Sequence, residues 1–126
     1  MATPNEFDPA ALEQLRALQG PEDPHLVVEL INSFLAGTPT ALDRLDAQVG
    51  GGEAKGTEQE AHRLRGLCGA LGLVAMARLC AELEEGARGG ALDGAPERMA
   101  ALRTTFESAR RWLEAERAKE GAPPSP

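Results

Sequence analysis

The residue of this sequence best suited to chemistry is His62, because a neutral imidazole is a good nucleophile near pH 7. Arg65 follows three residues later, one helical turn on, and could place positive charge beside the ring. Gly66 and Gly69 fall on the same side of such a helix. Each glycine in a helix interior costs about 1 kcal/mol relative to alanine, and clearance for an approaching partner would explain both. We therefore predict that His62 is a solvent-facing phosphoryl acceptor.

A helical wheel places His62 away from the core. The apolar residues around it recur at helical spacing and form one stripe, made of Ala61, Leu64, Cys68 and Leu71. At about 100° per residue, His62 lies roughly 140° from the centre of that stripe. A surface histidine usually has no special role, so exposure alone is weak evidence. The combination with Arg65 and the two glycines favours a functional histidine over a solvated one.

Composition and patterning predict an all-α protein of 126 residues, long enough for one domain with a real core. Alanine, leucine, glutamate and arginine dominate, as is typical of helices, and no strand or internal repeat is evident. Amphipathic segments alternate with glycine and proline. They predict an antiparallel up-and-down four-helix bundle with one or two short additional N-terminal helices. The bundle is expected over residues 7–119, and a disordered tail over residues 120–126.

Caps and helix breakers predict the helix boundaries. Asp8 before Pro9 predicts an N-cap, and Gly37 is expected to end the second helix, with a bend at Thr38-Pro39 that stays near the helix axis. Thr57 with Glu60 predicts a capping box, and hence a helix start just before His62. Glycines 50–52 with Gly56, and glycines 86, 89, 90 and 94, predict loops. The helices are expected over residues 9–19, from 22–24 to 36 and onward past Pro39, 57–71, 73–87 and 96–119.

Charge and composition argue against several classes of protein. A formal charge of −7 disfavours a nucleic-acid partner. The longest apolar run is far short of the roughly 20 residues that a membrane span needs, and no targeting signal opens the chain, so we expect a soluble cytoplasmic protein and, by default, a monomer. Cys68 and Cys80 fall at apolar helix positions, which favours core thiols over a disulfide or a redox role.

The stretch around His62 resembles the core pattern of the histidine-containing phosphotransfer (HPt) domain of bacterial and plant phosphorelays. The matching residues are Ala61, His62, Leu64, Arg65, Gly66, Leu71, Gly72, Leu79, Cys80, Leu83 and Glu84. Residues 30–35 and Pro39 also look like the second helix of that family, so the resemblance spans roughly residues 7–113. Two positions depart from the usual pattern: Arg65 replaces a lysine, and Leu67 replaces a small polar residue.

The resemblance implies a phosphorelay intermediate. His62 would accept a phosphoryl group on Nε2 from a receiver-domain aspartyl phosphate and pass it to another receiver aspartate. Arg65 would donate hydrogen bonds to the phosphoryl oxygens, and Gln59 could orient the ring. The implied partner-binding residues are Gly66, Gly69, Gln59 and Arg63. The implied partners are response-regulator receiver domains and a hybrid sensor histidine kinase, with no cofactor or metal on this chain and Mg²⁺ on the receiver.

Two other readings remain open. The chain could be a helical interaction or scaffold domain that keeps the same fold without phosphotransfer. An enzyme or metal protein is less favoured, because two distant histidines and two core-facing cysteines make no metal-ligand pattern. No glycine-rich phosphate loop is evident, so we expect a phosphocarrier without ATP-dependent kinase activity. The cognate kinase, the regulator and the direction of phosphoryl flow cannot be read from the residues.

Overall fold

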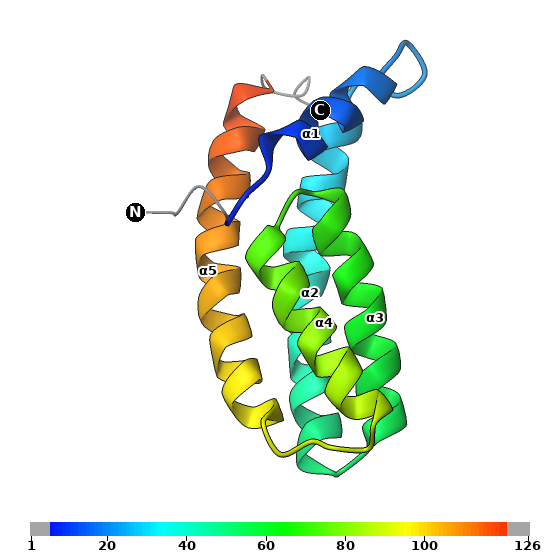
Figure 1. Ribbon diagram of the computed structural model, residues 1–126. Coiled ribbons are helices and arrows are strands. Elements are labelled where there is room, and N and C mark those ends of the chain that lie inside the picture. The colour runs from blue at the N-terminus through cyan, green and yellow to red at the C-terminus, as the bar shows by residue number, and fades with distance from the viewer. Residues whose placement is uncertain (1–5, 121–126) are drawn as a thin grey trace.

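A computed structural model describes residues 6–120 as a bundle of helices (Figure 1). The helices are α1 (Pro9–Leu18), α2 (Leu26–Gly50), α3 (Ala54–Ala70), α4 (Val74–Arg88) and α5 (Ala95–Lys119). The four long helices run alternately up and down, and short α1 lies across one end of the bundle (Figure 1). This confirms the predicted all-α fold, with one short N-terminal helix. Apart from Glu120, the tail predicted to be disordered lies outside the described residues.

The core is built from the apolar stripes of all five helices. The stripe predicted for α3 is buried at Ala61, Leu64, Cys68 and Leu71. Every predicted position of α5 is buried as well: Met99, Leu102, Phe106, Ala109 and Leu113. Because burial of apolar area is the main favourable term in folding, these stripes fix the rotation of each helix about its axis. The outer face of α3 follows from that rotation.

The two cysteines belong to this core. Cys68 of α3 and Cys80 of α4 are both fully buried and free of disulfides. Contact with Cys80, together with burial, raises the pKa of the Cys68 thiol far above its usual range. A thiol that stays protonated is a poor nucleophile, so Cys68 is not poised to react. Buried as they are, both cysteines pack as small apolar side chains. The prediction of core thiols is confirmed.

The turn between α3 and α4 is held by the N-terminal segment. Asp8 caps α1, because its side chain accepts from the Ala10 N–H at 3.1 Å. The Asp8 backbone N–H also donates to the Gly72 carbonyl at 2.8 Å. Gly72 has φ +76°, and a Cβ there would lie 2.3 Å from the Asp8 carbonyl oxygen, so only glycine fits. This contact ties the N-terminal segment to the turn between α3 and α4.

The prediction that Gly37 ends a helix is wrong. Helix α2 continues through Gly37 and contains Pro39 in its interior. An interior proline costs about 3 kcal/mol, but the buried stripe on α2 runs across it, with Phe34 before and Leu42 and Leu45 after. Packing of that stripe outweighs the local cost, as tertiary contacts commonly do for a helix.

The predicted capping box is also wrong. Helix α3 begins at Ala54, and Thr57 lies inside it, fully buried, with its hydroxyl donating to the Glu53 carbonyl at 2.9 Å. Glu60 pairs with two arginines instead of capping. A buried threonine that bonds back along the helix has the same sequence signature as a capping one. Three glycines expected in loops likewise lie inside helices: Gly50, Gly56 and Gly86. Helix α3 therefore extends about two turns before His62.

Candidate functional site

His62 stands on the outer face of α3, and its side chain is 65% exposed. The helical wheel predicted this exposure, and the structure confirms it. The antiparallel α3–α4 hairpin brings Glu84 of α4 next to the ring, although the two residues are 22 positions apart. His62 Nδ1 lies 2.8 Å from Glu84 Oε2, and the Glu84 side chain is only 5% exposed. An exposed imidazole is thus in hydrogen-bond contact with a buried carboxylate.

This contact determines which nitrogen of His62 can react. An ionised carboxylate only accepts hydrogen bonds, so the proton of the neutral ring belongs on Nδ1 and the lone pair on Nε2. The Arg65 Nη2 atom also lies 3.4 Å from Nδ1, which is too long to compete with a contact of 2.8 Å. Glu84 therefore holds the ring in the tautomer whose Nε2 is nucleophilic. It would also stabilise positive charge that develops on the ring.

Two arginines flank the ring, and both are anchored on Glu84. Arg65 Nε lies 3.3 Å from Oε1, a buried atom that forms this ion pair and, within residues 6–120, accepts no hydrogen bond of good geometry. Arg88 donates from Nη2 to Oε2 at 2.9 Å and from Nε to Glu58 at 3.1 Å. The hydrogen bond to Glu58 raises the pKa of Arg88 above its usual value, so it stays charged. The two arginines therefore place positive charge and N–H donors beside His62.

A shallow depression of about 390 Å³ surrounds the ring on the α4 side. Its lining residues come from α3 and α4: Lys55, Glu58, Gln59, His62, Glu84 and Arg88. Gln59 is exposed here, and the described contacts of His62 are with Glu84 and Arg65 rather than with Gln59. Glu84 contacts Nδ1 directly, while an orienting role for Gln59 stays a prediction.

Gly66 and Gly69 are exposed on the same outer face of α3. A Cβ atom built at either position would meet nothing within 4 Å. Packing inside the bundle therefore does not require glycine at either place. Since both glycines weaken the helix, the space they leave above α3 is the feature that distinguishes them.

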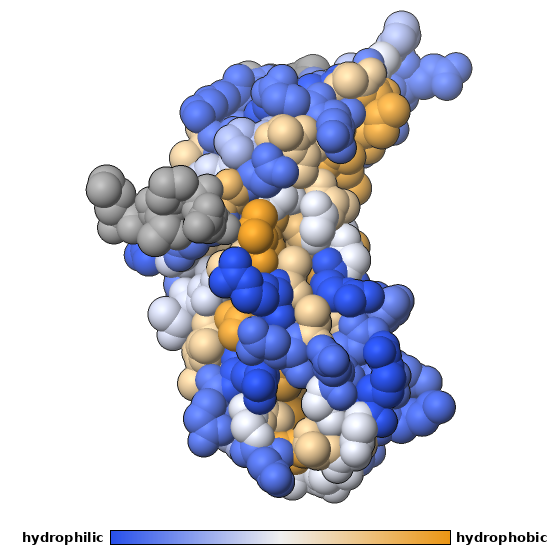
Figure 2. All heavy atoms as spheres, in the orientation of Figure 1, coloured by the Kyte–Doolittle hydropathy of each residue, from blue (hydrophilic) through white to orange (hydrophobic). Residues whose placement is uncertain are grey.

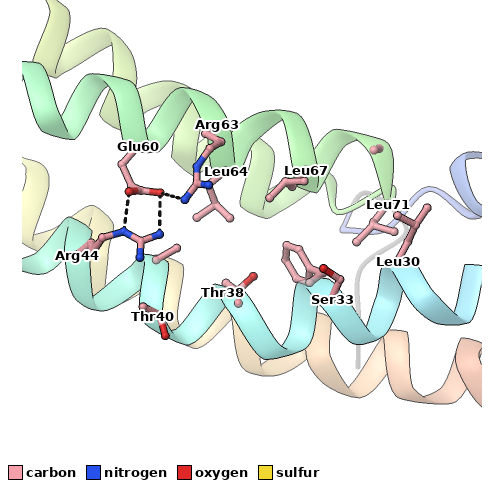
Figure 3. Close-up of a pocket in the computed structure, with 14 residues that line it drawn as sticks. Leu30, Ser33, Thr38, Thr40, Arg44, Glu60, Arg63, Leu64, Leu67 and Leu71 are labelled. Carbon is pink, nitrogen blue, oxygen red and sulfur yellow. Dashed lines mark hydrogen bonds and ion pairs between the residues drawn. The ribbon is translucent and has the colours of Figure 1, made fainter.

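Arg63 points to the other flank of α3, toward α2. It donates to Glu60 at 2.8 Å, and Glu60 also accepts from Arg44 of α2 at 2.9 Å (Figure 3). These residues close one end of a groove of about 400 Å³ between α2 and α3. Along the groove lie Leu30 and Leu67, which are 37% and 50% exposed. The predicted partner-binding residues are thus divided between two flanks of α3.

The surface around the hairpin is otherwise polar. Figure 2 shows hydrophilic side chains over much of α4 and the first half of α3. Among residues 6–120, no helix is both long and apolar enough to cross a membrane. The same residues contain no group of three or more His, Cys, Asp or Glu placed to hold a metal ion.

Sequence reasoning did not assign roles to Glu84, Arg88 and Glu58. Glu84 was noted only as part of the family pattern. One signal could have found it: Glu84 falls on the buried stripe of α4, together with Cys80, Leu83 and Ala87. Carboxylates are almost never buried without a partner, so a glutamate in a core register calls for a nearby cation or donor.

Comparisons with known proteins agree with this arrangement. The family model of the Hpt domain matches residues 29–112. Among solved structures, histidine-containing phosphotransfer protein B (HptB) from Pseudomonas aeruginosa PAO1 is similar, with a TM-score of 0.82 and 29% sequence identity. The match covers 93% of this chain and 98% of that one. No curated protein matches the chain significantly. The matched model covers most of the chain, including α3 and α4 with the His62 hairpin, and the chain therefore belongs to the Hpt domain family.

Proposed function

We propose that this protein accepts a phosphoryl group on His62 Nε2 from the aspartyl phosphate of one receiver domain and passes it to the aspartate of another. One observation carries the proposal: Glu84 holds Nδ1 at 2.8 Å while the ring remains 65% exposed. Membership in the Hpt family supports a phosphotransfer role in a phosphorelay. The particular donor and acceptor receivers, and a hybrid sensor kinase upstream, belong to the proposal.

The transfer needs no proton to leave the site. The Nε2 lone pair attacks phosphorus, the P–O bond to the aspartyl carboxylate breaks, and a P–N bond forms. The aspartate departs as a carboxylate, and the ring becomes a phosphorylated imidazolium that keeps its Nδ1 proton. Glu84, which accepts that proton in a hydrogen bond, stabilises the positive ring. The reverse reaction with a second aspartate regenerates the neutral imidazole, so the chain is a carrier and not a kinase.

Phosphoryl transfer depends mainly on positioning and on stabilising negative charge. On this chain Arg65 would supply charge from α3, one turn after His62, while its Nε remains near Glu84. The arginine fork can donate two parallel hydrogen bonds to phosphoryl oxygens. The Mg²⁺ ion that serves the transfer is proposed to belong to the receiver.

The partner surface is proposed to extend from His62 across the outer face of α3. A standard interface covers about 800 Å² on each partner, and Leu67 is only about 7.5 Å along the helix axis from His62. A receiver centred on the ring would therefore pass over Gly66 and Gly69 and reach the apolar groove that contains Leu67 and Leu30. The groove supplies apolar contact, and the glycines supply clearance.

The proposal is tested by incubating the chain with a phosphorylated receiver domain. We expect an acid-labile, alkali-stable phosphate on the chain, as is typical of phosphohistidine, and its loss in His62→Gln. His25→Gln is the matched control, because it removes the other histidine without touching the hairpin. Absence of phosphate with several receivers, or its persistence in His62→Gln, would favour a scaffold role for the same fold.

A further inference from the structure

Arg88 is held differently from Arg65, although both flank the same imidazole. Among the described residues, Arg65 contacts Glu84 and the ring, whereas Arg88 is shared between Glu84 and Glu58. Glu58 belongs to α3, one turn before His62, so the second bond of Arg88 crosses from α4 to α3 beside the ring. In the free protein Arg88 is therefore paired with Glu58, a carboxylate that would compete for it with any anion bound at His62.

Arg88 is close enough to reach a group on His62. Arg88 Nη2 and His62 Nδ1 both contact Glu84 Oε2, at 2.9 and 2.8 Å, so guanidinium and ring are within two hydrogen-bond lengths of each other. The Arg88 side chain is 62% exposed and lines the same depression as His62. Rotation of its guanidinium is therefore unobstructed by the core, and Glu84 can keep hold of one nitrogen while the others move.

Phosphorylation changes which acceptor Arg88 prefers. A phosphoryl group brings up to about two negative charges and three acceptor oxygens at pH 7, against one charge on Glu58. Arginine binds such a group bidentately. Glu58 is partly exposed, so water can solvate it once it is released. The exchange of partners thus favours the phosphorylated state without leaving a buried charge unpaired.

We propose that Arg88 and Glu58 form a latch: Arg88 is bound to Glu58 in the free protein and transfers to the phosphoryl oxygens when His62 is phosphorylated, keeping its contact with Glu84. This inference rests on the proposed phosphorylation of His62. The competition with Glu58 limits how strongly phosphohistidine is stabilised. A carrier must release its phosphoryl group as well as accept it. The latch brings the phosphorylated and unphosphorylated states closer in free energy.

The test is a double-mutant cycle on Glu58→Gln and Arg88→Ala, with each variant phosphorylated by phosphoramidate so that its phosphohistidine half-life can be measured without a receiver. The measurements are the half-life of phosphohistidine and the equilibrium fraction phosphorylated against a receiver. We expect Glu58→Gln to raise both by about two- to fivefold, because Arg88 loses its competitor. Arg88→Ala should lower both by a similar factor. In the double variant the effect of Glu58→Gln should vanish, because the residue it releases is gone.

Controls separate this latch from general charge effects and from the proposed function. Lys55→Ala removes a nearby positive charge that lines the same depression, and it should change the half-life by less than about twofold. Additive effects in the cycle, no effect of Glu58→Gln, or an effect of Lys55→Ala equal to that of Arg88→Ala would overturn the latch alone. If the wild-type chain takes phosphate from phosphoramidate but not from receivers, the proposed function fails while the latch is still measured. If His62 takes phosphate from neither donor, both fail.

Discussion

On each flank of helix α3 a glutamate pairs with two arginines, and the two clusters differ by one imidazole. On the α4 flank, Glu84 lies between Arg65 and Arg88 and also binds His62. On the α2 flank, Glu60 lies between Arg44 and Arg63, and in the described part of the chain it binds no histidine. Both glutamate side chains are largely covered, at 5% and 10% exposed. The charge pattern is therefore shared, and the chemistry is not.

The comparison shows what turns an ion-pair cluster into a reactive site. The hydrogen bond from Arg44, followed by that from Arg63, lowers the pKa of Glu60, and this cluster ties α2 to α3. Glu84 instead gives one oxygen to both Arg88 and His62, so its position sets the ring's tautomer and leaves Nε2 outside this contact, on a side chain that is 65% exposed. The Glu60 cluster lacks an exposed nucleophile held by a buried carboxylate.

The largest expected difference between the flanks is in the effect of removing each glutamate. Glu84→Ala should slow phosphoryl transfer to His62 by about 10- to 100-fold. Without Glu84 the ring is no longer held in the tautomer protonated on Nδ1, and the negative charge that stabilises the positive ring is gone. Glu60→Ala should change the rate by less than about twofold. Rapid-quench kinetics with a phosphorylated receiver measures both, with helical circular dichroism as the folding control. Equal losses for the two variants would mean that the Glu84 contact has no special role.

The second-largest effect is expected at Gly66, on the outer face of α3 between the two clusters. Gly66→Leu should reduce transfer from a receiver by about tenfold, because a bulky side chain fills the clearance over the helix. Loading by phosphoramidate should be nearly unchanged, since a small donor needs no such space. Gly66→Ala is the control, and it should stabilise the fold by about 0.5 to 1 kcal/mol, because its Cβ meets nothing within 4 Å. Equal slowing with both donors would point to damage at His62 itself.

A smaller effect is expected at Leu67 in the groove between α2 and α3, where a substitution should weaken receiver binding without changing the transfer step. Leu67→Ser should raise the receiver concentration needed for half-maximal transfer by about three- to tenfold, because it removes exposed apolar area from the groove. The rate at saturating receiver should not change. Leu18→Ser is the matched control: Leu18 is 70% exposed, lies on α1 and does not line the groove. A similar shift for Leu18→Ser would show that the groove is not the contact.

The smallest expected effect is on the pH dependence of stability. The pKa of Glu60 is lowered in the folded protein, so its contribution is full above the unfolded value near 4.5 and is lost as pH falls through the lowered folded value. Glu60→Gln should therefore lower Tm by about 2 °C or less at pH 7, and this difference should shrink progressively as the pH falls below 4.5. Thermal melts at several pH values measure it. A difference that grows in acid would contradict the assignment.

Local patterns were enough for the parts of the fold that depend on periodicity. The stripe of α3, the stripe of α5 and the Asp8 cap all lie where spacing and residue type predicted. Local sequence signals predicted the wrong structure at positions where tertiary packing outweighed them. Pro39 lies within a continuous helix, and Thr57 is buried inside α3 although its sequence context is that of a cap.

By itself, the sequence determined that α3 buries one stripe and turns His62 outward, because a helix repeats every 3.6 residues whatever it packs against. It also determined that a basic residue and two glycines share that outer face. Only the tertiary structure decided that Glu84 lies under the ring, that Arg88 and Glu58 meet beside it, and that Arg63 faces the opposite flank. The contacts of Glu84 and Glu58 join α3 to α4, which are connected through the Gly72 turn beside Asp8, and the flank that Arg63 faces is defined by α2. No single-helix pattern contains either arrangement.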